Sequence, residues 1–110
     1  MAGFIKGDIV VVPFPFSDLS GQKRCPALVL ANSQGNNLIL CRITTSLNRD
    51  IYAISLEKSD FEWGLFPEDS YSIRTNKLFT AKSKIIVRKA GALKIEKMSE
   101  VIQKLVAIFD

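Results

Sequence analysis

The sequence predicts a small, mainly β domain with one C-terminal helix. Short runs of β-branched and apolar residues are separated by turn residues at close intervals, which is typical of a small barrel of five or six strands. From Ile95 to Phe109, apolar residues instead recur at three- and four-residue steps, as on one face of an amphipathic helix. With 110 residues the chain has the size of one domain, so we expect residues 1–110 to share one core.

The first strand is predicted at Ile9–Val12. Its β-branched residues end at Pro13 and Pro15, which cannot donate backbone hydrogen bonds to a neighbouring strand. Residues 17–24 are polar and contain Ser20-Gly21, so we expect a loop. This loop is the first candidate functional segment.

A hairpin is predicted to follow. Residues 26–31 are apolar at every position, as in a strand covered on both sides, and residues 32–37 carry a dense turn signal. Residues 38–45 alternate, so we expect one face of this strand in the core and the other partly functional. The first face carries Ile39, Cys41 and Ile43, and the second carries Leu40, Arg42 and Thr44.

Two registers remain open for this hairpin. A two-residue turn at Gln34-Gly35 places Cys25 opposite Thr44 and Arg24 opposite Thr45, whereas a turn at Gly35-Asn36 shifts the partners by two residues. Either register brings residues 23–25 beside residues 44–46.

The remaining chain is predicted to hold three more short strands and the helix. The strands are expected at Tyr52–Leu56, Ser72–Arg74 and Lys84–Arg88, with a turn at residues 77–80. Residues 58–69 mix aromatic and acidic side chains without a clear period, so we expect a loop with one helical turn.

Several classes of protein are excluded by composition and motifs. The chain has no His, which rules out His-based triads and HExxH zinc sites, and its two Cys residues form no CxxC pair. Phosphate-binding loops of the GxxxxGK[ST] and GxGxxG types are absent. No apolar window is long enough for a membrane helix and no signal core is present, so we expect a cytoplasmic protein without a membrane partner.

Charge is unevenly distributed along the chain, whose formal net charge is +4. Residues 70–95 contain seven Lys and Arg residues and no acidic residue, whereas residues 57–69 contain five acidic residues and one Lys. The basic segment is typical of a phosphate-binding face, and equally of solvated strand edges that Lys keeps soluble.

An Arg beside Thr or Ser hydroxyls is the one arrangement in the sequence that suggests a catalytic or phosphate-binding function. RNA carries its own nucleophile, the ribose 2′-OH, so a protein need only hold the phosphate and stabilise its developing charge. A cross-strand surface pair is the structural alternative for Arg24 with Thr44 or Thr45. Phe14, Phe16 and Trp63 could stack on bases, although packing in a core or interface is the simpler interpretation.

Residues 6–21, KGDIVVVPFPFSDLSG, together with residues 23–30, KRCPALVL, closely resemble the PemK/MazF family of toxins. The resemblance continues through Ile43-Thr44, Ile73-Arg74-Thr75 and residues 77–79 to the C-terminal helix. It implies an SH3-like small barrel of the PemK/MazF/CcdB type. It further implies a sequence-specific, metal-independent mRNA interferase that inhibits growth by cleaving single-stranded mRNA and needs no cofactor.

The same resemblance implies partners and site residues. A homodimer, a cognate antitoxin and operator DNA reached through the antitoxin complex are expected partners. The catalytic residues are expected at Arg24 and Thr44. The RNA-binding residues are expected at Ser17, Ser20, Gln22, Lys23, Thr45, Ser46, Arg74 and Lys77.

Two positions depart from the family pattern. Family members place a catalytic Arg directly before the Pro of the second strand, where this chain has Cys25. Strand alternation turns Arg24 to the other face, unless a bulge restores it to the site. Tyr71 stands where some members have a carboxylate that transfers protons.

Two further functions therefore stay open. One is a catalytically impaired toxin homologue that only binds antitoxin or nucleic acid. The other is an SH3-like adaptor for a proline-rich peptide, against which the basic segment argues.

Overall fold

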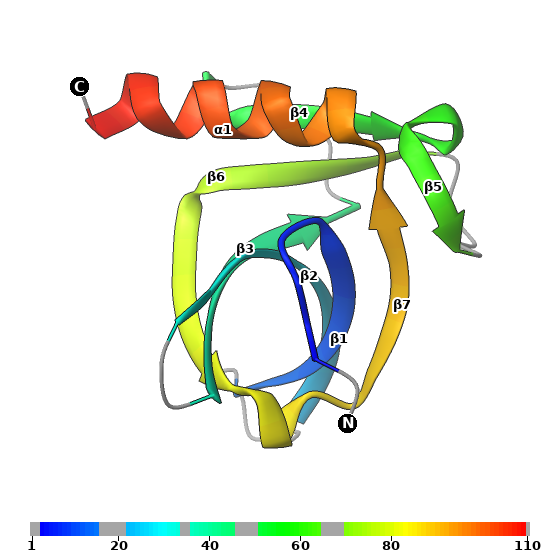
Figure 1. Ribbon diagram of the computed structural model, residues 1–110, viewed down its shortest axis with the longest axis vertical. Coiled ribbons are helices and arrows are strands. Elements are labelled where there is room, and N and C mark those ends of the chain that lie inside the picture. The colour runs from blue at the N-terminus through cyan, green and yellow to red at the C-terminus, as the bar shows by residue number, and fades with distance from the viewer. Residues whose placement is uncertain (1–2, 16–21, 34–35, 46–50, 65–69, 110) are drawn as a thin grey trace.

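The computed structural model describes residues 3–15, 22–33, 36–45, 51–64 and 70–109. Within these residues, seven strands form one antiparallel sheet that curls into a nearly closed barrel, and one α-helix lies across one end (Figure 1). The sheet order is β4-β6-β3-β2-β1-β7-β5. The elements are β1 (Asp8–Pro15), β2 (Gln22–Ser33), β3 (Asn37–Thr44), β4 (Ala53–Glu57), η2 (Lys58–Asp60), β5 (Phe61–Gly64), β6 (Ser70–Lys82), η3 (Ser83–Ile85), β7 (Arg88–Leu93) and α1 (Ile95–Phe109).

The predicted barrel with a C-terminal helix is confirmed, and two predicted elements are wrong in detail. The turn expected at residues 77–80 lies inside the long strand β6, and the strand expected at Lys84–Arg88 is the short 3-10 helix η3 followed by the start of β7. The helical turn expected within residues 58–69 is η2, and it leads directly into β5, a strand that the sequence pattern does not predict.

Strand alternation sorts the apolar side chains into two clusters. The larger cluster lies between the sheet and α1, which contributes Met98, Val101 and Leu105. The second lies on the opposite face of the same strands and includes Val29, Leu40 and Ala81. On β3, Cys41 and Ile43 belong to the first cluster, on the face predicted for the core. Leu40 belongs to the second cluster, so the face expected to be partly functional also carries buried apolar residues.

The hairpin of β2 and β3 adopts one of the two predicted registers over the part far from its turn, and a register that was not predicted beside the turn. Ala27 pairs with Arg42, as a turn at Gln34-Gly35 requires, but Ser33 pairs with Asn37, so the connection is residues 34–36. Asn36 adopts a left-handed φ of 63°, as Asn does more readily than most residues. An irregularity between Val29 and Ala31 then restores the predicted register further along the hairpin.

Helix α1 is fixed at its first turn by the segment between β4 and β5. The Lys97 Nζ atom lies 3.7 Å from Asp60 Oδ2 and 3.0 Å from Glu100 Oε1, and the Lys94 backbone N–H donates to the Asp60 carbonyl at 2.9 Å. Neither this helix nor any other helical segment within the described residues has the length and hydropathy needed to cross a membrane.

Candidate functional site

The strongest concentration of chemically useful side chains lies on β3 and β6. In this ladder Arg42 pairs with Arg74, Ile43 with Ile73 and Thr44 with Ser72. Because paired residues share a face and neighbours alternate, both Ile side chains face the core beneath α1 and the polar side chains share the opposite face. Two arginines and two hydroxyl-bearing residues therefore share one face of the sheet.

Burial distinguishes the two strands of this cluster. Arg74 and Ser72 on β6 are 8% and 9% exposed, whereas Arg42 and Thr44 on β3 are half-buried. The positive charge of Arg74 is consequently set back from the surface, and the β3 side chains form the accessible part.

Strand β6 is held firmly where it carries Arg74. The Cys41 thiol donates to the Arg74 carbonyl at 2.9 Å, while the Tyr52 carbonyl accepts from the Thr75 hydroxyl at 2.6 Å and from its N–H at 3.0 Å. Directly afterwards the β3–β6 register jumps, since Cys41 pairs with Leu78, and residues 75–77 bulge out of the ladder. Figure 1 shows β6 turning from the α1 end of the barrel down its side.

The pKa of the Cys41 thiol reflects both its burial and the nearby charge of Arg74. Burial raises the pKa of the Cys41 thiol from 9.0 to about 12, and the positive charge of Arg74 partly opposes that rise. The charge of Arg74 therefore acts within a poorly hydrated part of the protein.

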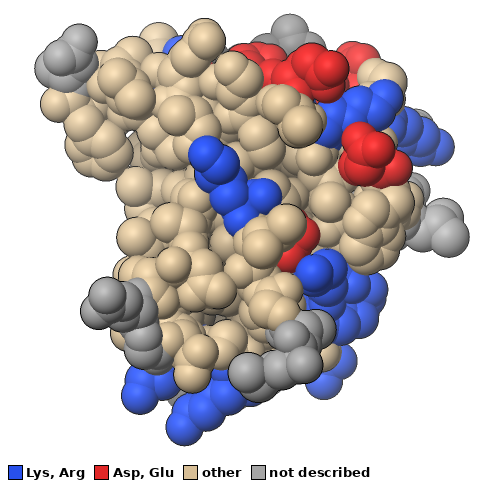
Figure 2. Space-filling model, viewed as in Figure 1, with Lys and Arg blue, Asp and Glu red and all other residues tan. Residues whose placement is uncertain are grey.

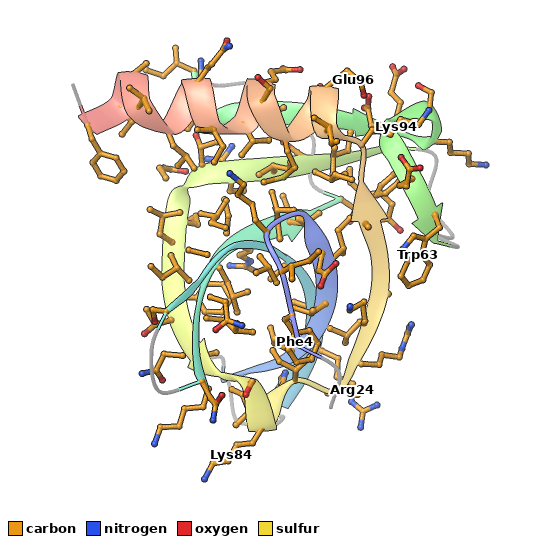
Figure 3. All side chains as sticks on the ribbon, viewed as in Figure 1. Phe4, Arg24, Trp63, Lys84, Lys94 and Glu96 are labelled. Carbon is orange, nitrogen blue, oxygen red and sulfur yellow. The ribbon has the colours of Figure 1, made fainter. Side chains whose placement is uncertain are left out.

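Arg24 lies in a different environment from these residues. The β1–β2 ladder keeps one register from Ile9–Leu28 to Pro15–Gln22, with Arg24 opposite Pro13 and Cys25 opposite Val12. This described stretch contains no bulge that would turn Arg24 toward the face of Cys25. Cys25 is 8% exposed, and Arg24 is exposed and points away from the barrel (Figure 3).

Cys25, rather than Arg24, therefore lies on the side of β2 that continues toward Thr44. Ala27 pairs with Arg42, and Cys25 and Thr44 each lie two residues further along their strands on the same faces. The recorded β2–β3 pairs stop at Ala27–Arg42.

The other predicted site residues are spread more widely. Thr45 and Lys77 are exposed, Lys77 within the bulge of β6, and Gln22 and Lys23 occupy the first positions of β2. Ser17, Ser20 and Ser46 lie outside the described residues. Arg42 is the residue that sequence reasoning missed as a site candidate. Its place on the partly functional face of the strand at residues 38–45 was the available signal.

Acidic side chains are less widely spread over the barrel than basic ones. Figure 2 shows most acidic side chains of this face near the start of α1, with basic side chains among them, and only basic charged side chains at the end away from α1. Arg24 and Lys84 mark the basic end, and Glu96 marks the other end beside Lys94 (Figure 3). The basic end also includes Lys82 and Arg88, which are exposed. Trp63, 51% exposed on β5, points outward, so the predicted packing in a core does not apply to it within this chain.

Comparisons with known proteins agree with this architecture. The MazE-MazF complex (Form-II) from Deinococcus radiodurans is similar at a TM-score of 0.79 and 16% identity, covering 99% of this chain and 97% of that chain. An endoribonuclease in complex with its cognate antitoxin from a mycobacterial species is similar at 0.74 and 15%, covering 97% and 95%. The Mycobacterium tuberculosis toxin MazF-mt6 is similar at 0.68 and 15%, covering 92% and 96%.

Sequence comparison supplies the family. No protein of curated function matches the sequence significantly. The model of the PemK-like, MazF-like toxins of type II toxin-antitoxin systems, however, matches residues 5–109. With nearly the whole chain matched and the barrel shared with solved MazF structures, this protein belongs to the PemK-like, MazF-like toxin family.

Proposed function

We propose that this protein is an endoribonuclease toxin that cleaves single-stranded mRNA in the cytoplasm, at specific sequences and without a metal ion. The observation that carries the proposal is the shared face of β3 and β6, where the Thr44 hydroxyl lies two residues from the Arg42–Arg74 pair. Membership of the toxin family and the likeness to two mycobacterial endoribonucleases support it.

The proposed reaction uses the nucleophile of the substrate. The ribose 2′-oxygen forms a bond to phosphorus while the bond from phosphorus to the 5′-oxygen breaks. The 2′-OH loses a proton and the departing 5′-oxygen gains one, which leaves a 2′,3′-cyclic phosphate and a 5′-OH. Thr44 donates to the phosphate through its hydroxyl, and Arg74 stabilises the negative charge that develops on the phosphate oxygens.

The remaining predicted residues are proposed to hold the RNA on either side of the cleaved bond. Arg24 is the predicted catalytic arginine. Its alternation with Cys25 supports contact with a neighbouring phosphate more than contact beside Thr44. The exposed basic end around Arg24, Lys82 and Lys84 supports binding of the RNA backbone through phosphate charge. The other proposed RNA contacts are Ser17, Ser20, Gln22, Lys23, Thr45, Ser46 and Lys77.

The proposed partners are a cognate antitoxin that covers the RNA-binding surface and a second copy of this chain. Structurally similar proteins are solved with an antitoxin, in one case as MazE-MazF, which supports the first partner. Operator DNA would be reached through the antitoxin complex.

A second candidate is a homologue that binds antitoxin or nucleic acid without cleaving RNA. It is favoured by one observation, the presence of Cys25 on the face where the family resemblance expects an arginine, with Arg24 turned to the other side. Under this alternative Cys25→Arg creates cleavage activity in a protein that is otherwise inert.

The deciding experiment is incubation of the purified protein with a long single-stranded RNA in EDTA, followed by mapping of the RNA ends. We expect discrete cuts with 5′-OH ends that disappear with Thr44→Ala and persist with Thr80→Ala, which removes an exposed hydroxyl from β6. Intact RNA with the unaltered protein and cleavage by Cys25→Arg would establish the second candidate instead.

A further inference from the structure

Arg42 occupies the centre of the polar face and has no role in the family resemblance. On β3 it lies between Ala27 of β2 and Arg74 of β6. Directly opposed residues of antiparallel strands have Cβ atoms about 4.5–5.5 Å apart, so the two arginine side chains start from adjacent points. The adjacency depends on the β6 bulge, because without it a different residue would face Arg42.

The neighbours of Arg42 along β3 match the requirements of phosphate chemistry. Thr44 is the next residue on the same face, about 6–7 Å along the strand, which is comparable to the reach of an arginine side chain. Arg42 and Thr44 are both half-buried, so an anion approaching from solvent meets these two side chains before the more deeply set Arg74.

Two arginines at directly paired positions on one face favour binding of an anion by both side chains. Like charges directly opposite each other in a sheet repel, and an anion that contacts both removes the repulsion. Each guanidinium presents a planar fork of N–H donors, which fits the two non-bridging oxygens of a phosphodiester. The anchored backbone of β6 at Arg74 limits the rearrangement that such binding requires.

We propose that Arg42 is a further catalytic residue, which contacts the scissile phosphate together with Arg74 and beside the Thr44 hydroxyl. The inference rests on the proposed ribonuclease function and names the arginine that serves it. Arg42 supplies, from β3, a positive charge on the face where β2 carries Cys25. Its role in the step is to neutralise charge on the non-bridging oxygens as the 2′-oxygen bonds to phosphorus and the 5′-oxygen departs.

The test compares Arg42→Gln, Arg42→Lys and Arg24→Gln with the unaltered protein, and uses Lys94→Gln as the matched control. Lys94 is an exposed cation near the start of α1, outside the proposed RNA-binding residues (Figure 3). Cleavage is followed in single turnover on a synthetic RNA that contains one mapped cut site. Binding is measured separately with the same sequence carrying 2′-O-methyl groups, which cannot be cleaved.

We expect Arg42→Gln to lower the cleavage rate by about 10²-fold or more, the effect of removing one donor to a developing oxyanion. Arg42→Lys should recover part of that loss, because it keeps the charge and lacks the fork. Arg24→Gln should cost less than Arg42→Gln, and Lys94→Gln should match the unaltered protein. Melting temperatures show whether each variant is folded, and if Arg42→Gln unfolds, Arg42→Lys decides by its cleavage rate at unchanged melting temperature.

The inference is overturned if folded Arg42 variants cleave at the unaltered rate, or if Arg24→Gln abolishes cleavage while Arg42→Gln does not. If the unaltered protein cuts no RNA, the proposed function fails, and binding of a 2′-O-methyl RNA of mixed sequence still tests the anion site. Weaker binding by Arg42→Gln than by Arg24→Gln then supports a phosphate contact at Arg42, and equal binding by Arg42→Gln and Lys94→Gln refutes it.

Discussion

The β1–β2 and β3–β6 ladders are both antiparallel, but they present their arginines in opposite ways. The first keeps one register over its whole length and leaves Arg24 exposed on the face away from Cys25. The second is broken by residues 75–77 and brings Arg42 and Arg74 together on one face. A regular ladder obeys alternation and separates neighbouring residues, whereas a bulge resets the partners and can collect like charges at one place.

The largest expected effect concerns the Cys41 thiol of β3, which is completely buried. Because burial raises its pKa from 9.0 to about 12, the thiolate fraction at pH 8 should be roughly 10³-fold lower than that of an ordinary cysteine. Iodoacetamide should therefore label Cys41 at a normal rate only in denaturant, as peptide mass spectrometry can show. Equal labelling of folded and unfolded protein would contradict the burial of this thiol beside Arg74.

The same thiol predicts a dependence of stability on pH. A folded-state pKa raised above the unfolded value contributes stability that is complete below pH 9 and is lost as the pH rises toward about 12. Urea unfolding at pH 8 and pH 10.5 should show the decrease, and Cys41→Ala, which has no thiol to ionise, should reduce it.

The next largest effect is expected from replacing Arg74, the arginine that the β6 bulge brings opposite Arg42. Arg74→Gln should lower RNA cleavage by about 10²-fold, because it deletes a donor to the phosphate from a poorly hydrated position. Lys77→Gln, three residues later and exposed in the bulge itself, should cost only a few-fold. Similar losses of RNA cleavage for Arg74→Gln and Lys77→Gln would show that pairing with Arg42 gives Arg74 no special role in cleavage.

The sequence predicts the placement of the arginine in the β1–β2 ladder better than in the β3–β6 ladder. The β-branched residues 9–12 and the apolar residues 26–31 predict two strands, and alternation alone separates Arg24 from Cys25. The partner of Arg42 could not be predicted in this way. It depends on a bulge at Thr75, Asn76 and Lys77, whose polar composition resembles an ordinary turn.

Two other elements were missed for related reasons. Strand β6 passes through the predicted turn at residues 77–80 because its long-range pairing with β3 overrides the local signal. Strand β5 shows no clear period because its register to β7 shifts between Phe61 and Trp63. The helix at residues 95–109 was predictable because its period depends only on neighbouring turns.

The Thr75 hydrogen bond that holds the β6 bulge to Tyr52 can be tested by protein stability, with a smaller expected effect. Thr75→Val keeps the shape of a side chain that is 1% exposed and removes its 2.6 Å hydrogen bond to the Tyr52 carbonyl. The free energy of unfolding should fall by about 1 kcal/mol, measured in urea, and Thr80→Val on the exposed part of β6 should change it by less than about 0.5 kcal/mol. Equal effects would mean that this bond does not fix the bulge.

The smallest expected effect concerns the exposed basic end of the barrel, where the β1–β2 ladder leaves Arg24. Lys84→Gln, at the same end of the barrel as Arg24, should weaken RNA binding a few-fold. It should also reduce the slope of log affinity against log salt by about one if Lys84 contacts one phosphate. Fluorescence anisotropy at several salt concentrations measures both values, and an unchanged slope would remove Lys84 from the RNA-binding surface.

The pairing of β1 with β7 has a consequence for the order in which this protein can fold. Asp8–Val11 pairs with residues that include Arg88 and Ala92, so the barrel joins segments about 80 residues apart. Contacts between distant segments form slowly, since the intervening chain must first be ordered. During synthesis, β1 has no β7 beside it until the ribosome has released Leu93, so the ribonuclease activity proposed for this protein would be acquired late in its synthesis.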